Sequence, residues 1–350
     1  MSDSPEASVP ALVLFGPTAS GKTEILNRLF ADNCLIPVEI VSADSMQVYR
    51  GMDIGTAKPD REERERLPHH LIDIRNPDEQ FNAGDFVRLA SEACAGIYLR
   101  GKLPVVSGGT GFYLKNFIQG LPEAPPSDPE IRRILREEMR ERGPAALMEE
   151  LETADPSSAG RIHLNDHYRL IRALEVHRLT GRPLSSFAPS GAADGKDGKF
   201  PRSPFRFLLI ALEREREDLY RRIDARCGAM FRRGLPAEVR RLWEAGYGPD
   251  DPGMKAIGYR EFFTEKEPGP ASGGEPGRRP LDRCPLSSDT ALVEALVARN
   301  SRRYAKRQIC YAASMPGVMR VYCGSGHDLD PVRQIRGELE KFLSSGGWFR

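Results

Sequence analysis

Residues 14–25 of the chain read LFGPTASGKTEI, which contains the spacing G-x-x-x-x-G-K-T. In such a loop, backbone N–H groups point at phosphate oxygens, and the N-terminus of the following helix adds partial positive charge. Lys22 can bridge phosphate oxygens, and the Thr23 hydroxyl can bind Mg²⁺. The stretch therefore predicts a phosphate-binding loop, made of Gly16, Pro17, Thr18, Ala19, Ser20, Gly21, Lys22 and Thr23.

Polar side chains also follow two later apolar runs. Asp44 comes directly after the run 37–42, and Thr110 follows the run 103–107 across two glycines. Enzymes that transfer phosphate from ATP usually hold Mg²⁺ with an aspartate at such a strand end, but the third run ends in a neutral hydroxyl. The sequence also contains no guanine-reading N-K-x-D stretch. A phosphate group is thus predicted to bind, while nothing visible recognises a nucleoside attached to it.

Two basic stretches indicate RNA as a partner. Residues 299–308 read RNSRRYAKRQ, with five basic side chains, no acidic ones and a tyrosine on a predicted helix. Basic side chains contact phosphates, and an aromatic ring can stack on a base. Arg169 and Arg172 share one face of another predicted helix, near Arg161, but Glu175 is within reach of that face. A solvated basic face and an intrahelical salt-bridged face are the respective alternatives.

The elements that must position these groups follow a βαβ rhythm. Apolar runs at 11–15, 37–42, 103–107 and 205–212 predict strands, and the amphipathic stretch 86–99 predicts a helix. This pattern is typical of a parallel sheet covered by helices. The predicted fold class is therefore α/β, with a P-loop NTPase-like parallel sheet flanked by helices. The core would comprise residues 1–121 and 201–350.

Residues 122–200 have another pattern and predict an all-helical insertion domain. Residues 127–130 read SDPE, the spacing of a capping box at Ser127, and Asn165 could cap a second helix that ends at Gly181. A Gly-rich stretch at 191–198 would be the flexible return to the core. Further on, residues 264–290 contain five prolines and four glycines and predict a disordered loop. Residues 291–312 then predict an amphipathic helix.

Composition excludes several classes of protein. The 350 residues are 40% hydrophobic and 29% charged, with a net charge of +1, as in an ordinary soluble globular protein. Contacts with RNA must therefore come from local patches. The first residues show no secretory pattern, and no apolar run reaches the ~20 residues of a membrane span. Six scattered cysteines without a C-x₂-C pair disfavour disulfides and a zinc site. We expect a cytoplasmic monomer without membrane contacts.

Taken together, these stretches resemble the tRNA dimethylallyltransferase family over residues 10–320. The resemblance is carried by GPTASGKT (16–23), DSMQVYRGMDIGTAKP (44–59), GGT (108–110), ND (165–166), Arg169, RALEV (172–176), IGYRE (257–261) and AKRQ (305–308). It implies transfer of a dimethylallyl group from dimethylallyl diphosphate to N6 of the adenosine 3′ of the anticodon. The cofactor would be Mg²⁺, held by Thr23, and the partner would be the anticodon stem-loop of tRNA. The loop at 16–23 would then hold the diphosphate of an isoprenoid.

The resemblance also implies roles for individual residues. Lys22 and Arg222 would stabilise the departing diphosphate, while Asp44 would accept the proton of the adenine amine with Thr110 nearby. The adenosine would be extruded into the site, and the helical insertion would clamp the stem-loop. The predicted tRNA-binding residues are Asp44, Ser45, Met46, Gln47, Thr110, Arg132, Tyr168, Arg169, Arg172, Tyr259, Arg302, Arg303, Lys306, Arg307 and Gln308.

Two other functions stay open from the sequence. A P-loop kinase of a nucleoside or small metabolite would consume ATP without tRNA, and the missing aspartate after Val106 argues against it. A non-catalytic RNA-binding protein would not need Lys22, Thr23 and Asp44 together. The role of Asp44 has its own alternative, because its carboxylate could be a partner of Mg²⁺ instead of a proton acceptor.

Overall fold

The computed structural model describes residues 8–30, 36–121, 124–187, 203–263, 286–324 and 330–345. The chain forms two compact units, Met1–Gly120 with Ala193–Arg350 and Leu121–Ala192. We call them the core unit and the helical unit. The predicted return linker at 191–198, and the predicted loop 264–290 up to residue 285, lie outside the described residues.

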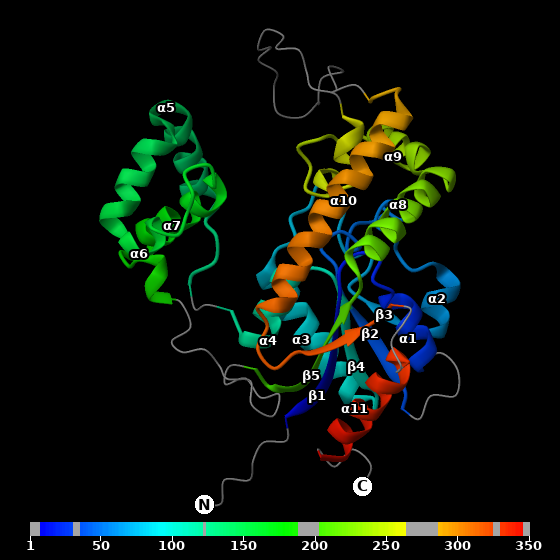
Figure 1. The fold of residues 1–350 in the computed structure, drawn as a ribbon. Helices are drawn as coiled ribbons and strands as arrows, with labels where there is room; N and C mark the ends of the chain where they lie inside the picture. The colour runs from blue at the N-terminus through cyan, green and yellow to red at the C-terminus, as the bar shows by residue number, and fades with distance from the viewer. Residues whose placement is uncertain are drawn as a thin grey trace, which may run out of the picture. The chain divides into compact units, whose positions relative to one another are not determined.

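A six-stranded sheet forms the centre of the core unit (Figure 1). Its order is β3-β2-β4-β1-β5-β6, and all neighbouring strands are parallel, which confirms the predicted fold class. The strands are β1 (Val9–Phe15), β2 (Val38–Ala43), β3 (His69–His70), β4 (Leu103–Gly108), β5 (Phe205–Glu213) and β6 (Met319–Tyr322). The sequence pattern does not predict β3 and β6, because edge strands of two and four residues carry no long apolar run.

Helices cover both faces of this sheet because alternate residues of a strand point to opposite sides. The helices of the core unit are α1 (Lys22–Phe30), α2 (Arg61–Arg66), α3 (Ala83–Leu99), α4 (Gly111–Gln119), α8 (Arg216–Arg232), α9 (Leu235–Glu244), α10 (Thr290–Ala313) and α11 (Pro331–Ser345), with short 3₁₀ helices η3 (Gly253–Lys255) and η4 (Arg260–Phe262). Val13 and Phe15 of β1 pack in a core with α3 and α4, whereas Leu12 and Leu14 pack in a core with α1 and α11. Figure 1 also shows α8 and α10 side by side, and both helices line the cavity beside the phosphate loop.

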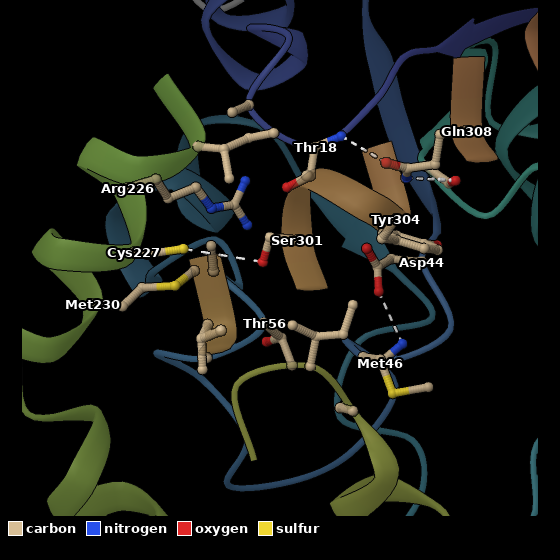
Figure 2. Close-up of a pocket in the computed structure, with 18 of the residues that line it drawn as sticks. Thr18, Asp44, Met46, Thr56, Arg226, Cys227, Met230, Ser301, Tyr304 and Gln308 are labelled. Carbon is tan, nitrogen blue, oxygen red and sulfur yellow. Dashed lines mark hydrogen bonds between the residues drawn. The ribbon is translucent and has the colours of Figure 1, made fainter. Parts of the chain in front are cut away.

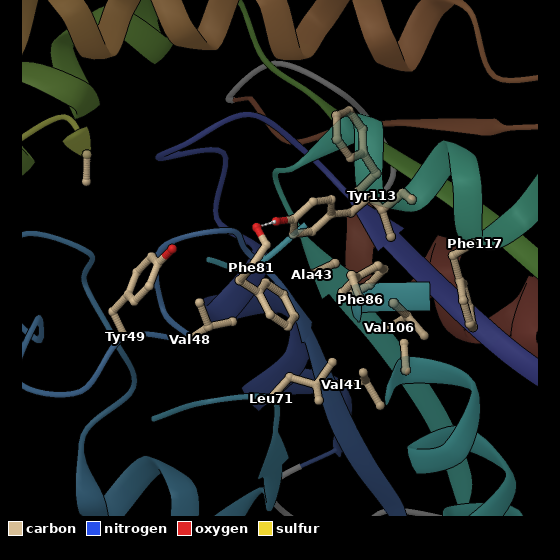
Figure 3. Close-up of a cluster of buried hydrophobic side chains, with 14 of the residues drawn as sticks. Val41, Ala43, Val48, Tyr49, Leu71, Phe81, Phe86, Val106, Tyr113 and Phe117 are labelled. Atoms are coloured by element: carbon tan, nitrogen blue, oxygen red, sulfur yellow. Dashed lines mark hydrogen bonds between the residues drawn. The ribbon is translucent and has the colours of Figure 1, made fainter. Parts of the chain in front are cut away.

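Aromatic side chains fill the core between the sheet and helices α3 and α4 (Figure 3). The ring of Phe86 stacks on that of Tyr113 with centroids 4.8 Å apart, and Phe81 meets Tyr113 edge-on at 5.9 Å. The Tyr113 hydroxyl donates a hydrogen bond to the Phe81 carbonyl at 3.1 Å, so its polar end is satisfied. This cluster packs against Val41 of β2 and Val106 of β4, just before the strand ends that lead to the polar residues at 44 and 110.

The helical unit contains α5 (Pro129–Ala154), α6 (Pro156–Ala159), α7 (His167–Thr180) and the 3₁₀ helix η1 (Leu184–Phe187). Its small core is made mainly of leucines from α5 and α7. The caps differ from the prediction by one residue each. Asp128 caps α5 and Asp166 caps α7, whereas the Ser127 hydroxyl donates to Glu175. Gly181 ends α7 with a φ of +69°, as predicted.

A buried carboxylate of α9 holds one loop of the core unit. Glu238 is 2% exposed and accepts hydrogen bonds from the N–H groups of Asp53 (3.1 Å), Ile54 (2.9 Å) and Gly55 (3.1 Å). The hydroxyl of Tyr259 donates to the same carboxylate at 2.6 Å. One buried side chain thus satisfies four donors, of which the Tyr259 hydroxyl is fully buried.

Replacing Glu238 with alanine should therefore lower the free energy of unfolding by about 3–5 kcal/mol. The buried Tyr259 hydroxyl and three part-buried N–H groups lose their acceptor, and an unsatisfied buried donor costs roughly 1–3 kcal/mol. Urea-induced unfolding followed by circular dichroism measures this change. The control is Glu340→Ala on the exposed face of α11, which should stay within about 0.5 kcal/mol of the parent. Equal stability of the two variants would contradict this account of α9.

Candidate active site

The loop between β1 and α1 has the compact shape that its sequence predicts. Ala19 has a φ of +62° and Gly21 a φ of +104°, so the backbone turns through the left-handed region twice. A non-glycine residue there costs of order 1 kcal/mol and persists only where its surroundings hold it. The ammonium group of Lys22 donates to the carbonyls of Gly16 (2.8 Å) and Pro17 (3.0 Å) and so folds over the loop.

Two arginines hold this loop by its carbonyl groups. The Nε of Arg214 donates to the Ser20 carbonyl at 2.8 Å, and the Nε of Arg222 donates to the Ala19 carbonyl at 2.9 Å. These contacts hold the strained loop in shape. Arg222 lines the cavity beside the loop, and its predicted contact with a diphosphate stays a prediction.

Two cavities meet at the loop. Cavity A has a volume of about 740 Å³ and is lined by the loop, α8, α10 and residues 255–257; cavity B has a volume of about 330 Å³ and is lined by parts of β2, α2 and α8. Figure 2 shows side chains that line cavity A. The residues that line both cavities are Lys22, Thr23, Asp44, Gln47, Ala57, Arg226 and Met230. The predicted metal ligand and the predicted proton acceptor are therefore both at the junction.

Asp44 offers one carboxylate oxygen to this junction. Its Oδ1 accepts from the N–H groups of Met46 (2.8 Å) and Gln47 (3.3 Å), which fixes the side chain. Its Oδ2 has no hydrogen-bond partner within the described ranges of the chain. Figure 2 shows the carboxylate of Asp44 beside the ring of Tyr304. A fixed carboxylate with a free oxygen can accept a proton or a hydrogen bond from a ligand.

Thr110 is brought next to Asp44 by a close contact between two strands. A Cβ atom added to Gly108 of β4 would lie 2.1 Å from the carbonyl oxygen of Ala43 of β2, so only glycine fits there. Beyond this contact, the Thr110 hydroxyl accepts from the Ser45 N–H at 3.0 Å. The carboxyl ends of strands β2 and β4 thus form one rigid wall of the site.

Some predicted tRNA-binding residues are engaged inside the protein. The amide of Gln47 accepts from the Ser42 hydroxyl at 2.9 Å and donates towards the carbonyls of residues 56 and 57 at 3.4 and 3.3 Å. Tyr259 has no exposed surface and donates to Glu238. Ser45 and Met46 line cavity A. Contacts of these residues with RNA stay predictions.

Helix α10 presents the other predicted residues in four ways. Arg303 and Lys306 are exposed, whereas Arg302 forms an ion pair with Asp224 of α8. The guanidinium of Arg307 lies 5.6 Å from the ring centre of Tyr304 and lines cavity A. Gln308 is buried at the wall of cavity A, and its amide bonds to two backbone groups, as described below.

The predicted tRNA-binding arginines of the helical unit form ion pairs with acidic side chains. Glu175 is fully buried and forms ion pairs with Arg132 (3.2 Å) and Arg172 (2.8 Å), so the salt-bridged alternative describes Arg172. Arg169 is exposed, and its Nη1 lies 3.3 Å from the Oδ2 of Asp166. The guanidinium of Arg132 lies 5.1 Å from the centre of the Tyr168 ring. Both residues line a third cavity, of about 470 Å³, with Arg136, Arg140 and His167.

Arg226 is a site residue that the sequence interpretation missed. It lines both cavities and has no hydrogen bond or ion pair in the described part of the chain. Desolvation lowers the pKa of Arg226, and Asp44 opposes that shift. Desolvation and the nearby Arg226 charge lower the pKa of Lys22 to about 8. Two neighbouring cations without a full counter-charge favour an anionic ligand. Arg226 follows Arg222 by one helical turn, and this spacing is the signal that could have identified it.

Tyr304 is a second such residue. The sequence interpretation considered it only as a ring available for stacking, but it lines cavity A beside Asp44. Burial raises the pKa of its hydroxyl to about 12, and the Asp44 charge adds to this effect. The phenol therefore stays neutral and can donate a hydrogen bond at neutral pH.

Two further observations bear on the class of site. Within the described segments, no group of three histidine, cysteine or acidic side chains could hold a metal ion. Among the helices of those segments, none is long and apolar enough to cross a lipid bilayer.

Comparisons with known proteins agree on one family. Residues 47–315 match the family model described as IPP transferase. The chain is 44% identical over 309 residues to a tRNA dimethylallyltransferase of Geobacter sulfurreducens, which covers 88% of this chain and 90% of that protein. It is 43% identical to tRNA dimethylallyltransferase 1 of Pelobacter propionicus, over 88% of this chain and 91% of that protein.

Solved structures give the same result. The full-length tRNA isopentenylpyrophosphate transferase from Bacillus halodurans superposes with a TM-score of 0.62 at 32% identity, covering 97% of this chain and 98% of that one. A eukaryotic dimethylallyltransferase acting on tRNA has a TM-score of 0.74 at 24% identity, over 97% of this chain and 80% of that one, and supports the fold.

Proposed function

Because this chain belongs to the IPP transferase family, we propose that it is a tRNA dimethylallyltransferase. It transfers the dimethylallyl group of dimethylallyl diphosphate to N6 of the adenosine 3′ of the anticodon and releases diphosphate. One observation of the structure supports the proposal independently of family membership. Lys22, Arg226 and Asp44 line both cavities where these meet, so two cations and a proton acceptor share one reaction centre.

The cationic side of this centre suits the diphosphate. As the allylic C–O bond breaks, its electron pair goes to the diphosphate, and positive charge develops on the allyl group. Lys22, Arg226 and the backbone N–H groups of the loop stabilise the developing negative charge. Lys22 and the loop are already held in place by hydrogen bonds. Arg222 sits against the same loop and adds positive charge there.

Mg²⁺ fits the residues that are present. This ion usually binds proteins through one or two oxygens and keeps its remaining positions for water and substrate phosphate. The Thr23 hydroxyl, at the start of α1 and at the cavity junction, would be its protein ligand, and Asp44 is a neighbouring carboxylate. When bound, the ion would neutralise charge on the diphosphate oxygens.

The carboxylate side suits the amine. The lone pair of adenine N6 is delocalised into the ring, so N6 is a poor nucleophile until its proton has an acceptor. As the N6–C bond forms, one N6 proton passes to the free Oδ2 of Asp44. Thr110 and Tyr304 lie beside Asp44 and supply hydrogen-bonding hydroxyls around the base. A stacked adenine cannot reach this centre, so the nucleotide must be extruded from the anticodon loop.

Incubation with unmodified tRNA and radiolabelled dimethylallyl diphosphate, followed by digestion, tests the proposal. Label should appear in N6-isopentenyladenosine and in no other nucleoside. ATP consumption with a small-molecule acceptor, and no labelled tRNA, would instead support the kinase alternative.

The exposed basic side chains of α10 provide a further prediction. In Arg303→Gln/Lys306→Gln, tRNA affinity should fall and the slope of log K against log salt should become shallower by roughly 1–2 units, because each lost phosphate contact removes about 0.7–0.9. Filter binding at several salt concentrations measures both effects. Affinity for dimethylallyl diphosphate should be unchanged.

The matched control is Arg333→Gln/Arg336→Gln on the exposed face of α11, which removes the same charge. If the α10 and α11 variants bind tRNA alike, the basic stretch is a solvated helix face.

A further inference from the structure

We infer that Gln308 is a positioning residue, which holds the diphosphate loop and the turn at residues 109–110 in register, and that its amide does not contact the tRNA. The inference rests on the proposed function, because it concerns how the two substrates are aligned. It assigns a different role to a residue whose basic neighbours on α10 favour RNA binding.

The contacts of the amide define this role. Its Oε1 accepts from the Thr18 N–H at 2.9 Å, and its Nε2 donates to the Gly109 carbonyl at 2.7 Å (Figure 2). Gln308 is 3% exposed. The acceptor end thus binds the loop and the donor end binds the turn, and only a primary amide of this length satisfies both.

The fit around the amide is tight. A Cβ atom added to Gly109 would lie 2.2 Å from the Nε2 of Gln308. The amide therefore occupies the space that a side chain at 109 would need. Moving the amide out of this position would remove the acceptor of the Thr18 N–H and the donor to the Gly109 carbonyl.

The two backbone segments joined by Gln308 serve different substrates. Thr18 belongs to the loop that binds the diphosphate, and Gly109 precedes Thr110, whose hydroxyl accepts from the N–H next to Asp44. Gln308 thus links the leaving-group side to the acceptor side. Reaction needs the allylic carbon and N6 about 3–3.5 Å apart, and a displacement of about 1 Å can cost 10²-fold in rate.

Gln308→Met tests the inference, because methionine has similar length and no amide. We expect the single-turnover rate with both substrates saturating to fall by about 10²-fold. The dissociation constants for tRNA and for dimethylallyl diphosphate, each measured alone, should stay within about 3-fold of the parent, since neither substrate loses a contact. The control is Gln334→Met on α11, which lines neither cavity A nor cavity B and should leave all three values unchanged.

Gly109→Ala tests the same linkage from the other side and guards against a Gln308 variant that does not fold. The added methyl displaces the amide while Gln308 itself remains, so the same fall in rate with retained affinities is expected.

A tRNA dissociation constant raised by more than about 10-fold in Gln308→Met, with a near-normal rate at saturation, would overturn the inference in favour of an RNA contact. An unchanged rate in Gly109→Ala would also overturn it. A parent protein that labels no tRNA would instead refute the proposed function, so the two failures are distinguishable.

Discussion

Asp44→Asn should lower the rate of dimethylallyl transfer by about 10²–10⁴, the usual contribution of a general base. Asparagine keeps the shape of the side chain and an oxygen for the N–H groups of Met46 and Gln47. It removes the basic Oδ2 that would take the N6 proton. Single-turnover kinetics at saturating tRNA measures the chemical step, and equilibrium binding of dimethylallyl diphosphate with Mg²⁺ should change little.

The matched control is Asp250→Asn, an exposed aspartate that lines neither cavity A nor cavity B. If Asp44→Asn instead abolishes binding of the diphosphate or of Mg²⁺, the carboxylate belongs to the metal site. The proton acceptor must then be another group or solvent.

Lys22→Ala should lower the transfer rate by about 10²–10³, because one preorganised contact with developing charge is typically worth about 3–4 kcal/mol. Arg226→Ala should lower the rate to a similar extent if the guanidinium of Arg226 faces the same diphosphate. If Arg226 has only a structural role, the substitution should lower the stability of the protein and leave the transfer rate unchanged. Single-turnover rates and thermal melts of the two variants separate these cases. Normal turnover in Lys22→Ala would refute the assignment of the diphosphate to this loop.

The pH dependence of binding gives an independent measure of Lys22. Its pKa is lowered to about 8, so the free protein loses the ammonium charge as pH rises through 8 and keeps it below. Affinity for dimethylallyl diphosphate should therefore decline above pH 8, and binding there should be accompanied by proton uptake. Calorimetry in buffers of different ionisation enthalpy detects that proton. The proton-uptake signal should be absent in Lys22→Ala.

The sheet could be predicted from sequence because both faces of its central strands are buried. Every residue of β2 and β4 is buried, so each strand is rich in apolar residues, although β2 also contains Glu39. The edges could not be predicted in this way, since β3 and β6 are short and only partly buried. The phosphate loop could be predicted because its function requires residue types at fixed spacing within one short segment.

The remainder of the site depends on contacts between distant segments. Arg222 and Arg226 lie on the same face of α8. The sequence does not reveal that Arg222 holds a loop carbonyl, while Arg226 lies at the cavity junction without a partner among the residues that the structure describes. Gln308 and Thr18 are 290 positions apart, so their hydrogen bond leaves no local pattern. Polar side chains in a basic stretch indicate contacts with RNA. Which of these side chains are instead buried in the protein depends on the fold, and the sequence alone does not show it.

The close approach at Gly108 has a consequence for engineering. Since a single methyl group at this position would collide with the backbone of Ala43, the separation between the Asp44 and Thr110 segments cannot be tuned by side-chain choice. Variants that accept bulkier isoprenoids should instead carry substitutions at side chains that line the cavity, such as Met230, Ile257 and Val297. A directed-evolution library for altered donor range should vary those three positions and leave residue 108 as glycine.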